Sequence, residues 1–131
     1  MLTSPKGIDI VARILIVDDE ETDRLLEQTI LERAGHETFT AAGGREAVNR
    51  YLAKGIDIVV TDLQMPGLHG LALITLLRGL VPRPRIIAIS GTGEPQLDIA
   101  QAVGADKTLS KPVDPDELLS AVEELLQSTP R

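Results

Sequence analysis

Short apolar runs alternate with segments of helical periodicity along this chain, and few folds are compatible with such an alternation. The apolar runs predict strands over Arg13–Val17, Glu37–Ala41, Ile56–Thr61, Arg85–Ser90 and Lys107–Ser110. The first of them, RILIV, is almost continuously apolar, which is typical of a strand buried on both faces of a sheet. The sequence therefore predicts a sheet of five strands.

Each predicted strand is followed by a segment whose apolar residues recur at helical spacing. The predicted helices are Glu21–Ala34, Arg45–Lys54, Leu68–Arg78, Pro95–Val103 and Leu118–Leu126. A glycine follows each of the first four, where a left-handed C-terminal cap is expected. The last is preceded by a capping-box pattern, with Asp114 as the N-cap, Pro115 next and Glu117 reaching back.

This order of elements indicates a parallel sheet with helices on both faces, because parallel strands are joined by right-handed crossovers. Ligands of such sheets bind at the carboxyl ends of the strands, near the point where the strand order reverses. We therefore expect functional residues directly after Val17, Thr61, Ser90 and Ser110. Residues 13–127 form the expected domain, and residues 1–12 and 128–131 are expected to be tails.

Composition narrows the class of protein. The chain has 131 residues, of which 43% are hydrophobic and 25% are charged, as in a globular domain. Its net charge of −7 argues against a generally basic surface for nucleic acid, and the absence of cysteine excludes disulfides and cysteine-ligated metals. No apolar run approaches the ~20 residues of a membrane span, and no secretory signal is visible. We expect a soluble cytoplasmic protein that binds neither nucleic acid nor membrane directly.

Acidic residues follow the first and third predicted strands. Asp18 and Asp19 begin a run of four acids, and Asp62 lies directly after the third strand. If these strands are neighbours, the three carboxylates converge and either raise one another's pKa or recruit a cation. A set of oxygen ligands without His or Cys favours a hard divalent ion, most plausibly Mg²⁺. Taken alone, Asp18 and Asp19 are explained equally well as solvated acids at a helix start.

A hydroxyl and an ammonium group follow the fourth and fifth predicted strands. Ser90 precedes a glycine, and Lys111 precedes Pro112. Each is a weak signal alone, because serine is common in turns and lysine is common on surfaces. Together with the carboxylates they would surround a tetrahedral anion, which suits phosphoryl transfer onto a carboxylate with Asp62 as nucleophile.

The motifs ILIVDDE, GHETFTAAGGREAV, DIVVTDLQMPG, IIAISG and LSKPVDPDELLSAVEELL occur in this order from Arg13 to about Gln127. In this order they resemble the receiver domain of bacterial two-component response regulators. The resemblance implies a flavodoxin-like (βα)5 doubly wound sheet with strand order 2-1-3-4-5. It also implies that Asp62 accepts a phosphoryl group from a histidine kinase or a histidine phosphotransfer protein and that the chain relays the signal to a downstream protein target. A homodimer remains open.

The resemblance also implies how the cation is held. Asp19 and Asp62 would bind Mg²⁺ directly together with the backbone carbonyl of Gln64, and Asp18 would act mainly through water. Gln64 and Thr92 occupy positions that tune the lifetime of the phosphoryl group in this family. Neither is acidic, so we expect no built-in general base for hydrolysis and a moderately long-lived phosphoryl group.

By the same resemblance, Ser90 is the switch hydroxyl, Lys111 contacts the phosphoryl group, and the Lys111–Pro112 peptide bond is cis. Thr108 departs from the pattern, because the family usually has Tyr or Phe three residues before the lysine. Threonine cannot fill the space of an aromatic ring. Either the output uses another surface, or the movement of the fourth helix is read without an aromatic reporter.

Two surfaces are further candidates for partner contacts. The first predicted helix docks the kinase in this family, which makes Thr22, Asp23 and Leu26 docking candidates. The third predicted helix has a sheet-facing set of Leu71, Ile74 and Leu77 beside a second apolar stripe of Leu73, Leu76 and Leu80. Either the stripe is a partner contact or the helix is buried more deeply than its neighbours.

Three other functions remain to be weighed. A phosphatase of the haloacid-dehalogenase type would need a second acid where Gln64 stands, and a cap domain for which 131 residues leave no room. A flavin-binding loop would be repelled by the acids after the first strand. A receiver-like module that works without phosphorylation is disfavoured by the intact set of site residues, although Thr108 keeps it open. The sequence predicts a stand-alone regulator or a receiver cut from a larger protein, and not an enzyme acting on other molecules.

Overall fold

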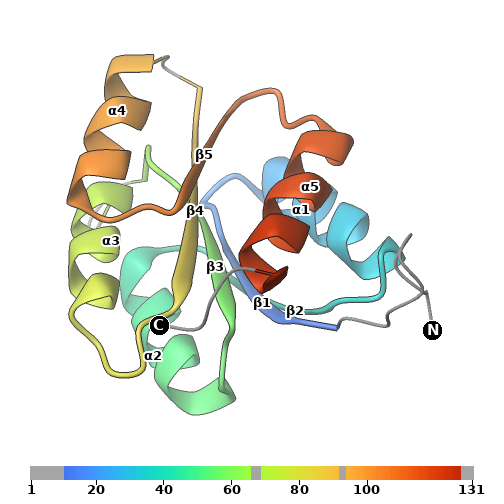
Figure 1. Ribbon diagram of the computed structural model, residues 1–131, viewed down its shortest axis with the longest axis horizontal. Helices are drawn as coiled ribbons and strands as arrows, with labels where there is room; N and C mark the ends of the chain where they lie inside the picture. Colours follow the sequence, from blue (N-terminus) through green and yellow to red (C-terminus); the bar gives the residue numbers. More distant parts are fainter. Residues whose placement is uncertain (1–10, 66–68, 92–93, 128–131) are drawn as a thin grey trace.

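The computed structural model describes residues 11–65, 69–91 and 94–127. Strands and helices alternate throughout these residues (Figure 1). The strands are β1 (Arg13–Val17), β2 (Glu37–Ala41), β3 (Ile58–Asp62), β4 (Arg85–Ser90) and β5 (Lys107–Ser110). The helices are α1 (Glu21–Arg33), α2 (Gly44–Lys54), α3 (Gly70–Arg78), α4 (Glu94–Val103) and α5 (Pro115–Gln127).

The strands form one parallel sheet in the order β2-β1-β3-β4-β5, which confirms the predicted fold class. The order reverses at β1, so β1 and β3 are neighbours although α1, β2 and α2 separate them in the chain. Val17 of β1 lies opposite Thr61 of β3, and Ser90 of β4 lies opposite Ser110 of β5. This register brings the carboxyl ends of four strands to one edge of the sheet.

Two apolar layers hold the helices against the sheet. Helices α1 and α5 cover one face, and α2, α3 and α4 cover the other (Figure 1). Successive residues of β1 point to opposite faces, so Ile14 and Ile16 pack under α1 and α5 while Leu15 and Val17 pack under the other three helices. Because both faces are covered, every residue of β3 and all residues of β4 after Arg85 are buried, as the continuous apolar runs indicate.

The helix ends largely follow the sequence pattern. Gly35, Gly55 and Gly104 have positive φ angles of 97°, 65° and 135°, as expected for left-handed caps. Gly79 differs, because its φ of −87° is available to any residue. At the start of α5, the Asp114 carboxylate accepts hydrogen bonds from the backbone N–H groups of the second and third helical residues, 2.8 and 3.4 Å away.

The start of β3 was predicted two residues too early. The strand begins at Ile58 rather than Ile56, and at Asp57 a side-chain contact replaces one of the backbone bonds to β1 while the Asp57 N–H still donates to the Arg13 carbonyl at 2.8 Å. The Asp57 carboxylate accepts the N–H of Arg13 at 2.8 Å, so the regular ladder with β1 starts one residue later. The sequence also placed the start of α3 at Leu68, which lies outside the described residues, and the described helix begins at Gly70.

Helix α3 is covered on a wider face than its sequence pattern suggests. Leu73, Ile74 and Leu77 have no exposed surface, so at Leu73 the second of the two alternatives holds, in which the helix is buried more deeply than its neighbours. Leu76 is 51% exposed, and Leu80 is only partly buried. The helix contacts α2 on one side and α4 on the other, which explains why residues beyond its sheet-facing row are buried.

Leu76→Lys is therefore expected to leave the domain folded. Half of the side chain already faces solvent, and the lysine stem can cover the same neighbours while its ammonium stays in water. We expect the free energy of unfolding, measured by urea titration, to change by less than ~0.5 kcal/mol. Loss of cooperative unfolding in this variant would contradict the placement of Leu76 at the surface.

Among the described residues, no helix combines the length and the apolar character that a bilayer crossing requires.

Candidate functional site

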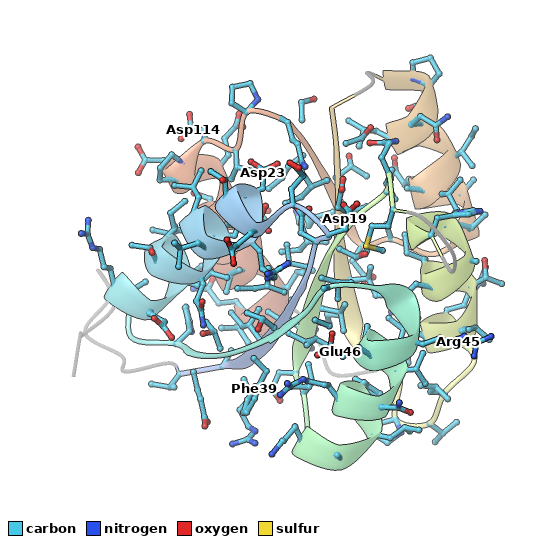
Figure 2. The ribbon with its side chains drawn as sticks, turned by 180° about the vertical axis from the view of Figure 1, so that it is seen from behind. Asp19, Asp23, Phe39, Arg45, Glu46 and Asp114 are labelled. Atoms are coloured by element: carbon cyan, nitrogen blue, oxygen red, sulfur yellow. The ribbon has the colours of Figure 1, made fainter. Side chains whose placement is uncertain are left out.

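Side chains from four strand ends meet at the carboxyl edge of the sheet. Asp18 and Asp19 follow β1, Asp62 is the last residue of β3, Ser90 is the last residue of β4, and Lys111 follows β5. The structure brings these predicted residues together because the strand order places β1, β3, β4 and β5 next to one another. Figure 2 shows Asp19 at this edge, between the helices of the two layers.

The three predicted carboxylates form one cluster. Asp18, Asp19 and Asp62 each offer an oxygen atom within 4.8 Å of the others. Asp18 and Asp62 are buried, whereas Asp19 is exposed. The Asp18 carboxylate accepts the backbone N–H of Glu20 at 2.9 Å, which fixes its orientation at the turn into α1. The cluster is therefore open to solvent on the side of Asp19 and enclosed on the other.

The Lys111 ammonium lies among three carboxylates. Its Nζ atom is 2.8 Å from Asp23 Oδ2, 3.3 Å from Asp18 Oδ2 and 3.6 Å from Asp62 Oδ1. The backbone of Lys111 is fixed to β4, because its N–H donates to the Ser90 carbonyl at 2.9 Å. The Lys111–Pro112 peptide bond is cis, as the resemblance implies.

Burial and charge shift the pKa values in this cluster. Desolvation and then the neighbouring Asp18 charge raise the pKa of Asp62 to about 6, although the Lys111 charge opposes them. Desolvation also raises the pKa of Asp18. Burial alone would lower the pKa of Lys111, but the hydrogen bond to Asp23 and the carboxylate charges raise it above its usual range. Each of these pKa values is raised, so the cluster favours binding of a further positive charge, either a proton or a cation.

The donor set fits a hard divalent cation such as Mg²⁺. All three side chains supply oxygen atoms, and the described part of the cluster offers no softer ligand. Asp62 Oδ1 is buried without a hydrogen-bond partner among the described residues, because Lys111 Nζ at 3.6 Å is too distant for a hydrogen bond. A cation at this oxygen would satisfy it and offset the repulsion between Asp18 and Asp62.

The hydroxyl of Ser90 is held toward the loop after β3. Ser90 is fully buried, and its Oγ donates to Gln64 Oε1 at 3.3 Å. Gln64 itself is exposed. Ser90 thus has a polar partner that a bound anion could replace.

Two other predicted residues lie away from this cluster or beyond the described chain. Thr108 is in β5 and lines a shallow groove of about 340 Å³ against α5, together with Leu109, Ser120 and Ala121. It is part of the surface formed by β5 and α5 rather than of the acidic cluster. Thr92 lies outside the described residues.

Sequence reasoning missed two acids of α1 that face the cluster. Asp23 was assigned only to partner docking, yet it is the nearest partner of Lys111. Glu27 was not singled out; it is 2% exposed, and burial followed by the Asp18 charge raises its pKa to about 8. The spacing could have suggested that they act together, because Asp23 and Glu27 are four residues apart in α1 and therefore share a face of the helix.

Comparison with known proteins agrees with this geometry. The sequence matches the family model of the response regulator receiver domain over residues 14–123. It is 32% identical to sporulation initiation phosphotransferase F of Bacillus subtilis over 117 residues, which cover 87% of this chain and 93% of that protein.

A longer relative and a solved structure extend the comparison. The chain is 30% identical over 122 residues to the sensory/regulatory protein RpfC of Xanthomonas campestris, covering 89% of this chain but only 17% of RpfC. The structure of chemotaxis protein CheY4 of Vibrio cholerae superposes with a TM-score of 0.82 at 29% identity, covering 88% of this chain and 99% of CheY4. The family match spans most of the chain, and its fold and acidic cluster agree with it, so the chain belongs to the response regulator receiver domains.

Proposed function

We propose that this chain is a phosphorylation-dependent signalling switch whose phosphoryl acceptor is Asp62. The donor is the phosphohistidine of a histidine kinase or a histidine phosphotransfer protein, and the output is a contact with a downstream protein. The observation that carries the proposal is the Asp62 carboxylate itself: it is buried, close to two other carboxylates and 3.6 Å from the Lys111 ammonium. The names of the relatives, which include a phosphotransferase, support the same reaction class.

The reaction is a displacement at phosphorus. A carboxylate oxygen of Asp62 forms a bond to phosphorus while the P–N bond of the donor breaks. The imidazole nitrogen leaves with the electron pair of that bond and takes up a proton from solvent. Asp62 must be ionised to attack, and a pKa of about 6 leaves it mostly ionised at neutral pH.

The residues around Asp62 have separate tasks. Mg²⁺ would be held directly by Asp19, Asp62 and the backbone carbonyl of Gln64, and Asp18 would act through water. The bound ion would neutralise negative charge on the transferred phosphoryl group. The Lys111 ammonium would contact the phosphoryl oxygens. The chain catalyses only its own phosphorylation and dephosphorylation. The dephosphorylation is slow, because neither Gln64 nor Thr92 supplies a general base for hydrolysis.

Phosphorylation changes the charge that Ser90 and Lys111 meet. The new group adds about −1.5 to −2 charges and three acceptor oxygens at Asp62. Ser90 would exchange Gln64 for a phosphoryl oxygen, and the carboxyl end of β4 would move with it. If the chain exists in two conformations, shifting their ratio from 1:99 to 99:1 takes about 5.5 kcal/mol. Two charge-assisted hydrogen bonds to the phosphoryl group, of ~1.5–3 kcal/mol each, supply most of that free energy.

Asp62→Asn is expected to abolish phosphoryl uptake, because the amide is not a nucleophile for phosphorus. After incubation with Mg²⁺ and acetyl phosphate, the intact mass of the wild type should rise by about 80 Da, the mass of one PO₃H unit. The variant should gain nothing, and the wild type with EDTA should also gain nothing.

Asp98→Asn provides the matched control, because Asp98 is an exposed acid of α4 on the outside of the domain. It should gain the same mass as the wild type. An undiminished gain in Asp62→Asn would overturn the assignment of the acceptor.

A further inference from the structure

Asp23 holds the Lys111 ammonium more closely than either buried aspartate does. Asp23 Oδ2 accepts a hydrogen bond from Nζ at 2.8 Å, whereas Asp18 and Asp62 lie at 3.3 and 3.6 Å. The contact joins residues 88 positions apart in the chain, so it depends on the assembled sheet rather than on local sequence. The lysine side chain is 21% exposed and that of Asp23 is 38% exposed, which leaves the pair accessible from solvent.

The first turn of α1 is fixed where Asp23 can make this contact. The Arg24 guanidinium donates to the Asp18 carbonyl at 2.7 Å, and the Arg24 N–H donates to the Glu20 carbonyl at 2.9 Å. The first bond ties the helix start to the residue that follows β1, and the second is the first backbone bond of the helix itself. Figure 2 shows Asp23 on this turn, on the same edge of the molecule as Asp19.

A simpler explanation for Asp23 is the helix dipole, which favours acids in a first turn. Glu21 is also an acid of this turn, and it has the same relation to the dipole. The dipole does not account for the 2.8 Å contact with Lys111, and that contact distinguishes Asp23 from its neighbour.

We propose that Asp23 is a positioning residue that holds the Lys111 ammonium in the unphosphorylated chain and releases it when Asp62 carries a phosphoryl group. This inference rests on the proposed function. An ammonium group has three donors, and a phosphoryl group offers more negative charge and more acceptor oxygens than one carboxylate does. The phosphoryl group therefore competes with Asp23 for Lys111, and the strength of the Asp23 contact opposes phosphorylation.

Asp23→Asn tests the hold in the unphosphorylated chain. The amide keeps the size of the side chain and removes its charge, so Lys111 should react faster with an amine-modifying reagent, by roughly three- to tenfold. Peptide mass spectrometry would report the rate at Lys111 beside that at the exposed Lys54 as an internal standard. Glu21→Gln makes the same charge change in the same turn and should alter the Lys111 rate by less than about twofold.

The release is tested by the rate of mass gain with acetyl phosphate and Mg²⁺. Asp23→Asn should take up the phosphoryl group roughly three- to tenfold faster than the wild type, because Lys111 no longer has to break its ion pair with the Asp23 carboxylate. Asp23→Glu, which restores the charge, should return both rates toward the wild-type values. Glu21→Gln should again differ little from the wild type.

The outcomes separate this proposal from the proposed function. Equal modification and equal uptake rates in Asp23→Asn and Glu21→Gln would overturn the role of Asp23 while the function stands. Faster modification with unchanged uptake would overturn the release. If neither the wild type nor any variant gains mass, the proposed function fails, and so does the proposed release of Lys111 on phosphorylation. The modification rates would still report whether Asp23 holds Lys111 in the unphosphorylated chain.

Discussion

Glu27→Gln is expected to stabilise the domain by about 4 kcal/mol at pH 8, which is a large share of the 5–15 kcal/mol typical of a domain. Glu27 is 2% exposed, and its Oε2 has no hydrogen-bond partner among the described residues. Burial, followed by the charge of Asp18, raises its pKa from 4.5 to about 8. Glutamine keeps the shape of the neutral acid and cannot ionise.

The sign of the pH dependence follows from this shift. Between pH 4.5 and pH 8 the unfolded chain has released the Glu27 proton while the folded chain still holds it. The stabilising contribution of the neutral Glu27 side chain is therefore complete below pH 4.5, is lost as the pH rises, and levels off once the pH has passed through the folded-state pKa of about 8. Urea titrations in Mg²⁺-free buffer should show the wild type losing about 3 kcal/mol between pH 5 and pH 8 relative to Glu27→Gln.

Glu21→Gln is the control for this measurement, because Glu21 is an exposed acid of the same helix. Its unfolding free energy should follow that of the wild type within ~0.5 kcal/mol at every pH. If the difference between Glu27→Gln and the wild type were the same at pH 5 and pH 8, Glu27 would not be the buried titrating group.

Gly70→Ala is expected to destabilise the domain by about 3 kcal/mol or more and to slow phosphoryl uptake. A Cβ atom at this position would lie 2.3 Å from the Asp62 carbonyl oxygen and 2.6 Å from the Leu63 Cα atom. Both are backbone atoms, so no side chain can rotate away. Either α3 or the end of β3 has to shift, and the second movement displaces the Asp62 carboxylate, which is the proposed acceptor. Thermal unfolding and the mass-gain assay together measure both effects.

Gly79→Ala, at the other end of α3, is the matched control. Its Cβ would meet only the Leu76 carbonyl oxygen, at an ordinary contact distance of 3.6 Å, and its φ of −87° suits alanine. We expect a change within ~1 kcal/mol. Equal stability of the two alanine variants would show that α3 does not approach β3 as closely as described.

The main features of the fold could be predicted because each depends on local pattern. Continuous apolar runs mark β1 and β4 as strands buried on both faces, and glycines mark several helix ends. The convergence of Asp18, Asp62 and Lys111 could be predicted as well, since the carboxyl ends of neighbouring parallel strands share an edge.

The features that the sequence missed depend on packing between distant elements. Asp23 was predicted only as a docking candidate, because its contact with Lys111 arises when α1 lies beside the loop after β5. Glu27 reads as a surface residue, because charged side chains are rarely buried. The sequence could not decide whether Leu73 is exposed or buried, because that depends on the packing of α2 and α4 on either side of α3.

The distribution of the site along the chain has a consequence for protein synthesis. Lys111 Nζ contacts Asp18 across 93 positions, so the cluster draws on both ends of the domain. A nascent polypeptide still attached to the ribosome carries the carboxylates of Asp18, Asp19 and Asp62 long before Lys111 emerges. Competence to receive a signal therefore arises only once translation of the domain is nearly finished, and truncated products lack the ammonium group altogether.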